Sequence, residues 1–223
     1  MANPSFIKIS AELWLATAGI LAPPFYFALV TTLGALEPEY SHLTKMMSIL
    51  GGVSGARGTI FNIGVMMTGS LVIAFALGLQ LQLPAKVSSR VGVGLLTFGG
   101  VGLIGSGIFS CNEGCRNILT EPDLIGRLHM IASLFAGMGT ALAPFFIWAA
   151  MRDEMKWQRF VWPTFMTAIL ANLPGITLWA TIFTDTRLVS IEGLIQRLGL
   201  VFTLIWIFFV GARLWQLVPL RKN

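Results

Sequence analysis

The side chains best suited to acid–base chemistry gather in one polar stretch between two long apolar runs. Glu121 and Asp123 are followed by His129 at the start of the next run. An imidazole has a pKa of about 6.5, so it can donate or accept a proton near neutral pH. These residues are candidates for the catalytic site of a hydrolase-like intramembrane enzyme, in which Asp123 or Glu121 would orient His129. The alternative, which we favour, is a histidine that hydrogen-bonds across helices, for example to Asn62.

Two cysteines, Cys111 and Cys115, lie at the beginning of the same stretch. In an oxidising exterior, a pair this close is expected to form a disulfide. The spacing also fits half of a structural zinc site that His129 or Asp123 would complete, but such a site usually needs four ligands and a second cysteine pair is missing. We therefore favour the disulfide over a metal site. In the opposite membrane orientation, both would be free thiols.

Three arginines recur at an interval of 70 residues, namely Arg57, Arg127 and Arg197. The sequence around two of them also repeats, since residues 124–128 read LIGRL and residues 194–198 read LIQRL. A repeat of this kind predicts three helical hairpins with the arginines around one mouth of a bundle, where they would bind an anionic group. The alternative is that any long basic side chain at a helix end reaches out to water. Four more residues complete the predicted ligand-binding set: Asn62, His129, Tyr40 and His42.

Composition decides the class of protein in which these residues work. Of the 223 residues, 55% are hydrophobic and 11% are charged, whereas soluble chains carry about 25% charged residues. The mean hydropathy is +0.78. These values exclude a secreted globular domain, a disordered tail and a nucleic-acid binder, despite an isoelectric point of 9.7. They leave a polytopic membrane protein.

Six apolar runs are long enough to cross the hydrocarbon core of a membrane as helices. Transmembrane barrel strands would alternate polar and apolar residues, and these runs are continuously apolar, so helices are expected. We predict an all-α fold with a single six-helix domain over residues 1–223. The expected spans are residues 13–33, 59–81, 91–109, 125–151, 160–183 and 194–218.

The distribution of charge predicts the orientation. With the N-terminus in the cytoplasm, nine of the fifteen Lys and Arg residues fall on the cytoplasmic side, as the positive-inside rule requires. We expect a multi-pass protein of a bacterial or archaeal cytoplasmic (inner) membrane, with both termini in the cytoplasm and both cysteines and both histidines outside. The first run is long, contains Pro23 and Pro24 and lacks a cleavage site, so we expect a retained helix rather than a signal peptide.

Small residues and prolines predict how the helices pack. The third run contains seven glycines, which indicates either a central helix in close contact with its neighbours or a smooth wall against a ligand. In the fourth run, a stripe of residues four apart is expected to mark the packed side: His129, Ser133, Gly137 and Ala141. Kinks are expected at Pro23–Pro24 and at residues 172–175.

Several segments resemble a known family. They are AGILAP at 18–23, PEYS at 38–41, MSILG at 47–51 and FNIG at 61–64, together with GIF at 107–109 before CNEGC at 111–115 and the later His129. Nearly the whole chain is similar to a prokaryotic family of six-span membrane proteins, the domain of unknown function numbered nine-nine-eight. The resemblance implies six helices and a membrane location, and it implies no particular activity. Where members often carry proline and aspartate, this chain has Ser110 and Asn112.

These observations favour a protein that binds a lipid or another amphipathic small molecule in an outward-facing cavity. Arg57 and Arg127 would bind an anionic group and the glycine-rich helix would face the apolar part. The alternatives are a non-catalytic subunit of a larger membrane complex, the enzyme that uses His129, and a transporter with a broken fifth helix. The expected partners are membrane lipids and other membrane subunits, without nucleic acid. No nucleotide-binding or metalloprotease motif identifies a cofactor.

Overall fold

The computed structural model describes residues 4–111, 123–184 and 191–220. Within them it contains six long α-helices and two short 3₁₀ helices. In chain order these are α1 (Pro4–Leu36), η1 (Met47–Gly52), α2 (Ala56–Gln82), α3 (Val87–Ile108), α4 (Leu124–Met151), η2 (Met155–Trp157), α5 (Gln158–Thr184) and α6 (Glu192–Leu220). Each predicted run falls within one long helix, apart from one residue at the end of the third run. The all-α fold is therefore confirmed.

All six long helices are long and apolar enough to cross a membrane. At about 1.5 Å per residue, the 27 residues of α2 extend about 40 Å, more than the hydrocarbon core of about 30 Å. Large apolar side chains such as Ile60, Ile63 and Met67 are exposed along α2. Such a surface is stable against lipid rather than water, so the molecule is a multi-pass membrane protein.

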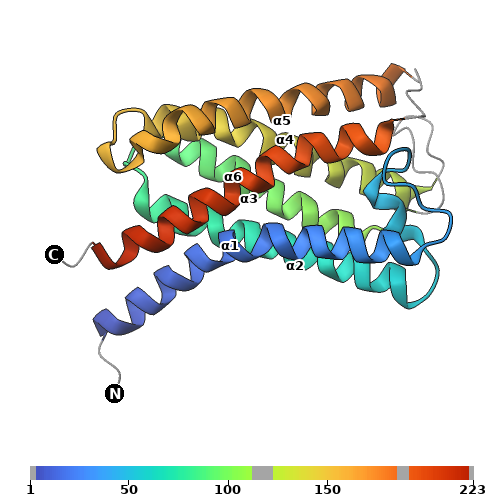
Figure 1. Cartoon of the computed structure of the whole chain (residues 1–223), viewed down its shortest axis with the longest axis horizontal. Helices are drawn as coiled ribbons and strands as arrows, with labels where there is room; N and C mark the ends of the chain where they lie inside the picture. The colour runs from blue at the N-terminus through green and yellow to red at the C-terminus, as the bar shows by residue number, and fades with distance from the viewer. Residues whose placement is uncertain (1–3, 112–122, 185–190, 221–223) are drawn as a thin grey trace.

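Successive helices run in opposite directions and pack as a closed ring (Figure 1). Each helix contacts the next one along the chain, and α6 closes the ring against α1. One end of the bundle, here called the terminal end, carries both chain ends and the connections 83–86 and 152–157. The opposite end, here called the loop end, carries the connection 37–55 and the starts of α2, α4 and α6. Arg57, Arg127 and Arg197 therefore all lie at the loop end.

Glycines bring α3 close to both of its neighbours. A Cβ atom on Gly102 would lie 2.7 Å from the backbone oxygen of Ala132, and one on Gly139 would lie 2.6 Å from that of Leu95. On the other side of α3, a Cβ atom on Gly100 would lie 2.8 Å from the backbone oxygen of Gly69 in α2. Side chains are excluded at these positions because the helix backbones nearly touch. Helix packing therefore explains these glycines, in place of a wall against a ligand.

The packed side of α4 differs from the predicted stripe. His129 is buried as expected, but Gly137 is exposed, and the buried positions continue through Ala132, Ala136 and Gly139. Residues four apart advance 400° around a helix with 3.6 residues per turn, so each step drifts by about 40°. A stripe of three such steps therefore leaves the face on which it begins, which explains why this prediction is wrong beyond Ser133.

The prolines are incorporated without interrupting the helices. α1 contains Pro23 and Pro24, and α5 contains Pro163 and Pro174. Figure 1 shows α1 changing direction along its length, as expected for a helix with two internal prolines. In α5, Asn172 Nδ2 donates to the backbone oxygens of Ala168, at 2.6 Å, and of Ala141 in α4, at 2.7 Å. The amide therefore links the two helices beside the proline.

Candidate functional site at the loop end

Arg197, in the second turn of α6, fastens the connection that follows α1. Its Nη1 donates to the backbone oxygens of Gly193, at 2.7 Å, and of Lys45, at 3.1 Å. Its Nη2 donates to the Tyr40 hydroxyl and, at 3.1 Å, to Nδ1 of His42. The guanidinium carbon also lies 5.6 Å from the centre of the Tyr40 ring. Four N–H groups of one side chain are thus directed at residues 40–45 and at its own helix.

Two further contacts join the same connection to α6. The backbone N–H of Leu194 donates to the oxygen of Leu43 at 2.9 Å, and that of Met47 donates to Oε1 of Gln196 at 2.6 Å. Residues 40–47 are therefore hydrogen-bonded to the start of α6. Gln196 was not among the predicted site residues, although it lies inside the repeated LIQRL segment.

The electrostatics of this cluster follow from partial burial. Burial raises the pKa of Tyr40 above its usual value, and the neighbouring Arg197 partly opposes the shift. Burial and then the charge of Arg197 lower the pKa of His42. A neutral His42 suits the contact, because its Nδ1 must be unprotonated to accept the hydrogen bond from Arg197.

Arg57 and Asn62 stabilise the other half of the connection. Nη1 of Arg57 donates to the backbone oxygen of Leu36 and lies 3.3 Å from Oε2 of Glu37. Nδ2 of Asn62 donates to the backbone oxygen of Gly51 at 3.0 Å. Both residues were predicted to bind a ligand. In the structure they hold the end of α1 and the helix η1 against α2.

His129 is 4% exposed and hydrogen-bonds with both ring nitrogens. Nδ1 lies 2.6 Å from the backbone oxygen of Phe109 and 3.1 Å from that of Ser106, so it carries the proton and donates. Nε2 lies 3.2 Å from Oγ of Ser133, which donates to it. The ring caps carbonyl groups at the end of α3 that lack helical partners. This geometry favours the structural interpretation, with α3 rather than Asn62 as the partner.

The remaining candidates lie around the start of α4. Asp123 is the N-cap of α4, and its Oδ2 accepts the backbone N–H of Gly126 at 3.3 Å. Cys111 is buried and disulfide-bonded. Glu121 and Cys115 lie outside the described residues, so the pairing of the two cysteines stays a prediction. Within the described part of the chain, no group of three His, Cys, Asp or Glu side chains is arranged to hold a metal ion.

Arg127 differs from the other two arginines of the repeat. It lies in the first turn of α4, and its side chain is exposed and makes no hydrogen bond or ion pair within the described residues. The structure therefore places the three arginines at one end of the bundle but does not use them alike. The side chains of Arg57 and Arg197 contact the protein itself, and that of Arg127 makes no such contact in the described residues.

The fold defines a polytopic α-helical membrane protein. At its loop end, contacts within the protein hold the connection 37–55 against α2 and α6. The chain belongs to the family described as "Protein of unknown function (DUF998)", which matches residues 20–213. This match confirms the resemblance seen in the sequence. Neither the comparison with curated proteins nor that with solved structures finds a match.

Proposed function

We propose that this protein binds an anionic amphipathic molecule, in the simplest case a membrane lipid, at the outward-facing loop end. The observation that carries the proposal is the exposed guanidinium of Arg127, which has no anionic partner in the described residues. A guanidinium at a membrane interface pairs well with a phosphate group, because its planar N–H donors match two phosphate oxygens. Arg57, expected to share this role, is already paired with Glu37.

An apolar stripe below Arg127 would accommodate the hydrocarbon part of such a molecule. Ile131, Phe135 and Met138 follow Arg127 on one side of α4 and are exposed. The ring of Phe135 packs 4.6 Å from that of Phe98 on α3, which widens this apolar surface. A charged contact above an apolar stripe corresponds to the arrangement of a phospholipid, whose charged headgroup lies above its apolar chains. The proposed site is thus a surface between α3 and α4, in place of a glycine-lined wall.

A site-specific cross-link tests this proposal. Ile131 is replaced by the photoreactive p-benzoylphenylalanine, and the protein is placed in nanodiscs that contain phosphatidylglycerol and phosphatidylcholine. We expect preferential capture of phosphatidylglycerol, and we expect Arg127→Gln to reduce that preference about fivefold, as for an exposed charge pair of ~1 kcal/mol. The matched control is Arg90→Gln, which removes an exposed arginine at the start of α3. Equal capture of the two lipids by the protein with Arg127 intact would refute the proposal.

The proposal includes an orientation, with both termini in the cytoplasm of the cell. The excess of Lys and Arg at the terminal end supports this orientation. Ser54→Cys at the loop end and Ala85→Cys at the terminal end both introduce an exposed thiol. We expect a membrane-impermeant maleimide added to intact cells to label the variant at 54 and not the one at 85. The reverse pattern would place Arg127 in the cytoplasmic leaflet.

A second candidate function is that of a subunit in a larger membrane complex. The observation that favours it is the broad exposed face of α5, where Leu173 is 60% and Ile176 is 66% exposed. The membrane-spanning window of α5 is also the least buried of the six. Cross-linking in native membranes through Leu173→Cys should give one adduct of defined mass, and the same treatment of Ile60→Cys on α2 should not. Equal, diffuse labelling at both positions would indicate contact with lipid alone.

A further inference from the structure

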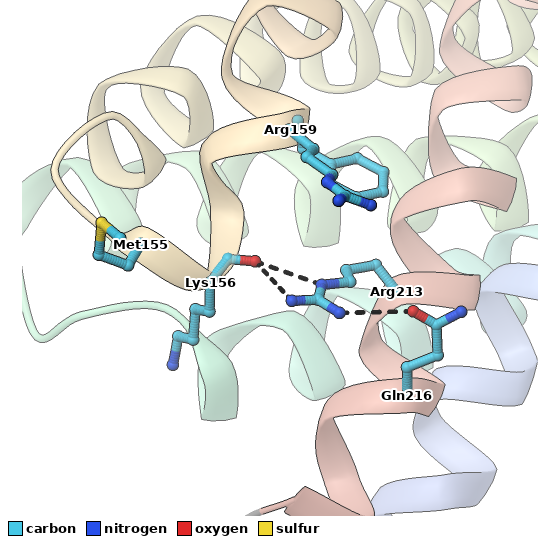
Figure 2. A pocket seen from close by; sticks show the side chains of 6 residues that line it. Met155, Lys156, Arg159, Arg213 and Gln216 are labelled. Atoms are coloured by element: carbon cyan, nitrogen blue, oxygen red, sulfur yellow. Dashed lines mark hydrogen bonds between the residues drawn. The ribbon is translucent and has the colours of Figure 1, made fainter.

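A pocket at the terminal end brings together three positively charged side chains. It lies between η2, the first turn of α5 and the last turns of α6, as Figure 2 shows, and its volume is about 590 Å³. That volume falls in the usual range for small-molecule sites. Six residues line it: Met155, Lys156, Arg159, Phe160, Arg213 and Gln216. Half of them are cations, and none is acidic.

Arg213 is held in a fixed orientation without losing its charge. Its Nε and Nη2 donate to the backbone oxygen of Lys156 at 3.2 and 3.0 Å, and its Nη1 lies 3.4 Å from Oε1 of Gln216 (Figure 2). These partners are neutral, so the guanidinium is positioned but not neutralised. A guanidinium has five N–H donors. Three are engaged here, which leaves one on each terminal nitrogen.

The other two cations are not neutralised within the described residues either. The side chains of Lys156 and Arg159 are exposed and make no ion pair or hydrogen bond there. Two acidic residues lie just before the pocket in the sequence. Glu154 forms no ion pair within the described residues, and Asp153 lies 2.9 Å from Nζ of Lys86 and 3.7 Å from Nε of Arg152. Lys86 holds the pKa of Asp153 below its usual range, so this carboxylate is ionised and already paired. In the part of the chain that the structure describes, the three cations of the pocket therefore have no ion-pair partner.

Two exposed tryptophans indicate the depth of the pocket relative to a membrane. Trp162 on α5 and Trp215 on α6 lie within a turn of the lining residues Arg159 and Gln216, and both are exposed. Tryptophan is enriched where lipid headgroups meet the hydrocarbon core. The three cations are therefore at the level of the headgroups, while Phe160 and Met155 provide apolar contacts beside them.

We propose that this pocket binds the phosphate of an anionic phospholipid from the leaflet at the terminal end. Arg213 is the oriented contact, and Lys156 and Arg159 add charge from the rim. Basic pockets between transmembrane helices on the cytoplasmic side are a recognised means of binding such headgroups. The site lies at the opposite end of the bundle from Arg127 and is independent of the function proposed above.

Cross-linking at the rim of the pocket tests the proposal. Met155, an exposed lining residue, is replaced by p-benzoylphenylalanine in the full-length protein, and nanodiscs of phosphatidylcholine receive increasing fractions of phosphatidylglycerol. We expect saturable capture of phosphatidylglycerol. Lys156→Gln or Arg159→Gln should raise the half-saturating fraction about fivefold, and the double variant about thirtyfold, as expected for ~1 kcal/mol per basic residue. Neither side chain holds another part of the protein, so both variants should fold.

The control variants separate this site from general attraction and from the loop end. Arg90→Gln removes the same charge at the terminal end without touching the pocket, and it should leave the half-saturating fraction unchanged. Arg127→Gln should also leave it unchanged. An equal effect of Arg90→Gln, or equal capture of phosphatidylcholine, would overturn the proposal. Displacement of the lipid by millimolar inorganic phosphate would do so as well, because it would identify a free phosphate site.

Discussion

The two ends of this bundle both carry arginines, but, with the exception of Arg127 at the loop end, their side chains have different roles at the two ends. At the loop end, Arg197 directs four N–H groups at the protein, and Arg57 is paired with Glu37. At the terminal end, the side chains of Lys156 and Arg159 make no hydrogen bond or ion pair in the described residues, and Arg213 contacts only neutral groups. A basic residue near a membrane is therefore a candidate ligand contact when the protein does not neutralise its charge and leaves some of its N–H donors unengaged.

The largest effect on stability is expected from replacing Arg197, whose side chain holds residues 40–45 against α6. Arg197→Ala removes four hydrogen bonds, three of which join residues 40–45 to α6, so we expect a loss of about 3 kcal/mol in the free energy of unfolding. Hydrogen exchange of the amides at 40–47 should become faster, and a denaturation curve in mixed micelles measures the stability. Arg197→Lys keeps the charge but not the planar fork, and it should recover only part of the loss. The same loss in Arg127→Ala would contradict the comparison.

The second prediction concerns the buried polar contact between α3 and α4. His129→Phe keeps an aromatic ring but leaves the oxygen of Phe109 and the hydroxyl of Ser133 without their partner. We expect a loss of about 2 kcal/mol in the free energy of unfolding, because buried polar groups are then unsatisfied. His129→Asn can place a donor near the position of Nδ1, and should lose less. Equal stability of His129→Phe and the unaltered protein would show that these hydrogen bonds do not support the loop end.

A smaller effect is expected from pH. The pKa of His42 is lower in the folded protein than its ordinary value of about 6.5, so folding favours the neutral ring. Its contribution to stability is therefore complete above that pH and is lost as the pH falls below it. Protonation would remove the acceptor for Arg197 and place two cations side by side. The protection of the amides at 40–47, measured by hydrogen exchange relative to the intrinsic exchange rate at each pH, should decrease as the pH falls below about 6.5, and His42→Gln should flatten this dependence.

The smallest expected effect is at the terminal end. Lys156→Gln together with Arg159→Gln should change the free energy of unfolding by less than about 0.5 kcal/mol, because surface substitutions without specific contacts rarely do more. The same denaturation measurement used for Arg197→Ala provides the comparison. A loss as large as that of Arg197→Ala would show that these cations have a structural role, and the contrast between the two ends would disappear.

The helices could be predicted from the sequence because lipid imposes a simple rule, namely a long continuous apolar run. The same rule explains why the predicted spans lie within helices such as α1 and α4. The packed side of α4 needed a finer rule, in which steps of three and four residues alternate from His129 to Ala132, Ala136 and Gly139. The predicted spacing of four residues leads from His129 through Ser133 to Gly137, which no longer lies on that face.

The candidate site was harder to predict because its contacts involve backbone carbonyls. Every residue has a carbonyl oxygen, so no residue type marks Lys45 or Gly193 as an acceptor for Arg197. Similarly, the pocket around Arg213 is formed by residues of η2 and α6 that are distant in the sequence. Lys156 and Arg213, for example, are 57 positions apart. The signal that could have indicated it was the pair Lys156 and Arg159, close in sequence and without an acidic residue between them.

The contacts of Arg197 also constrain the order in which the protein can assemble during synthesis. Tyr40 and Arg197 are 157 residues apart. At an elongation rate of 5–20 residues per second, the ribosome makes the first roughly 8–30 s before the second. Throughout that interval the segment after α1 lacks the partner that fastens it, and it acquires that partner only when the last helix has entered the membrane. The loop end is therefore completed last, by a residue in the second turn of the last helix.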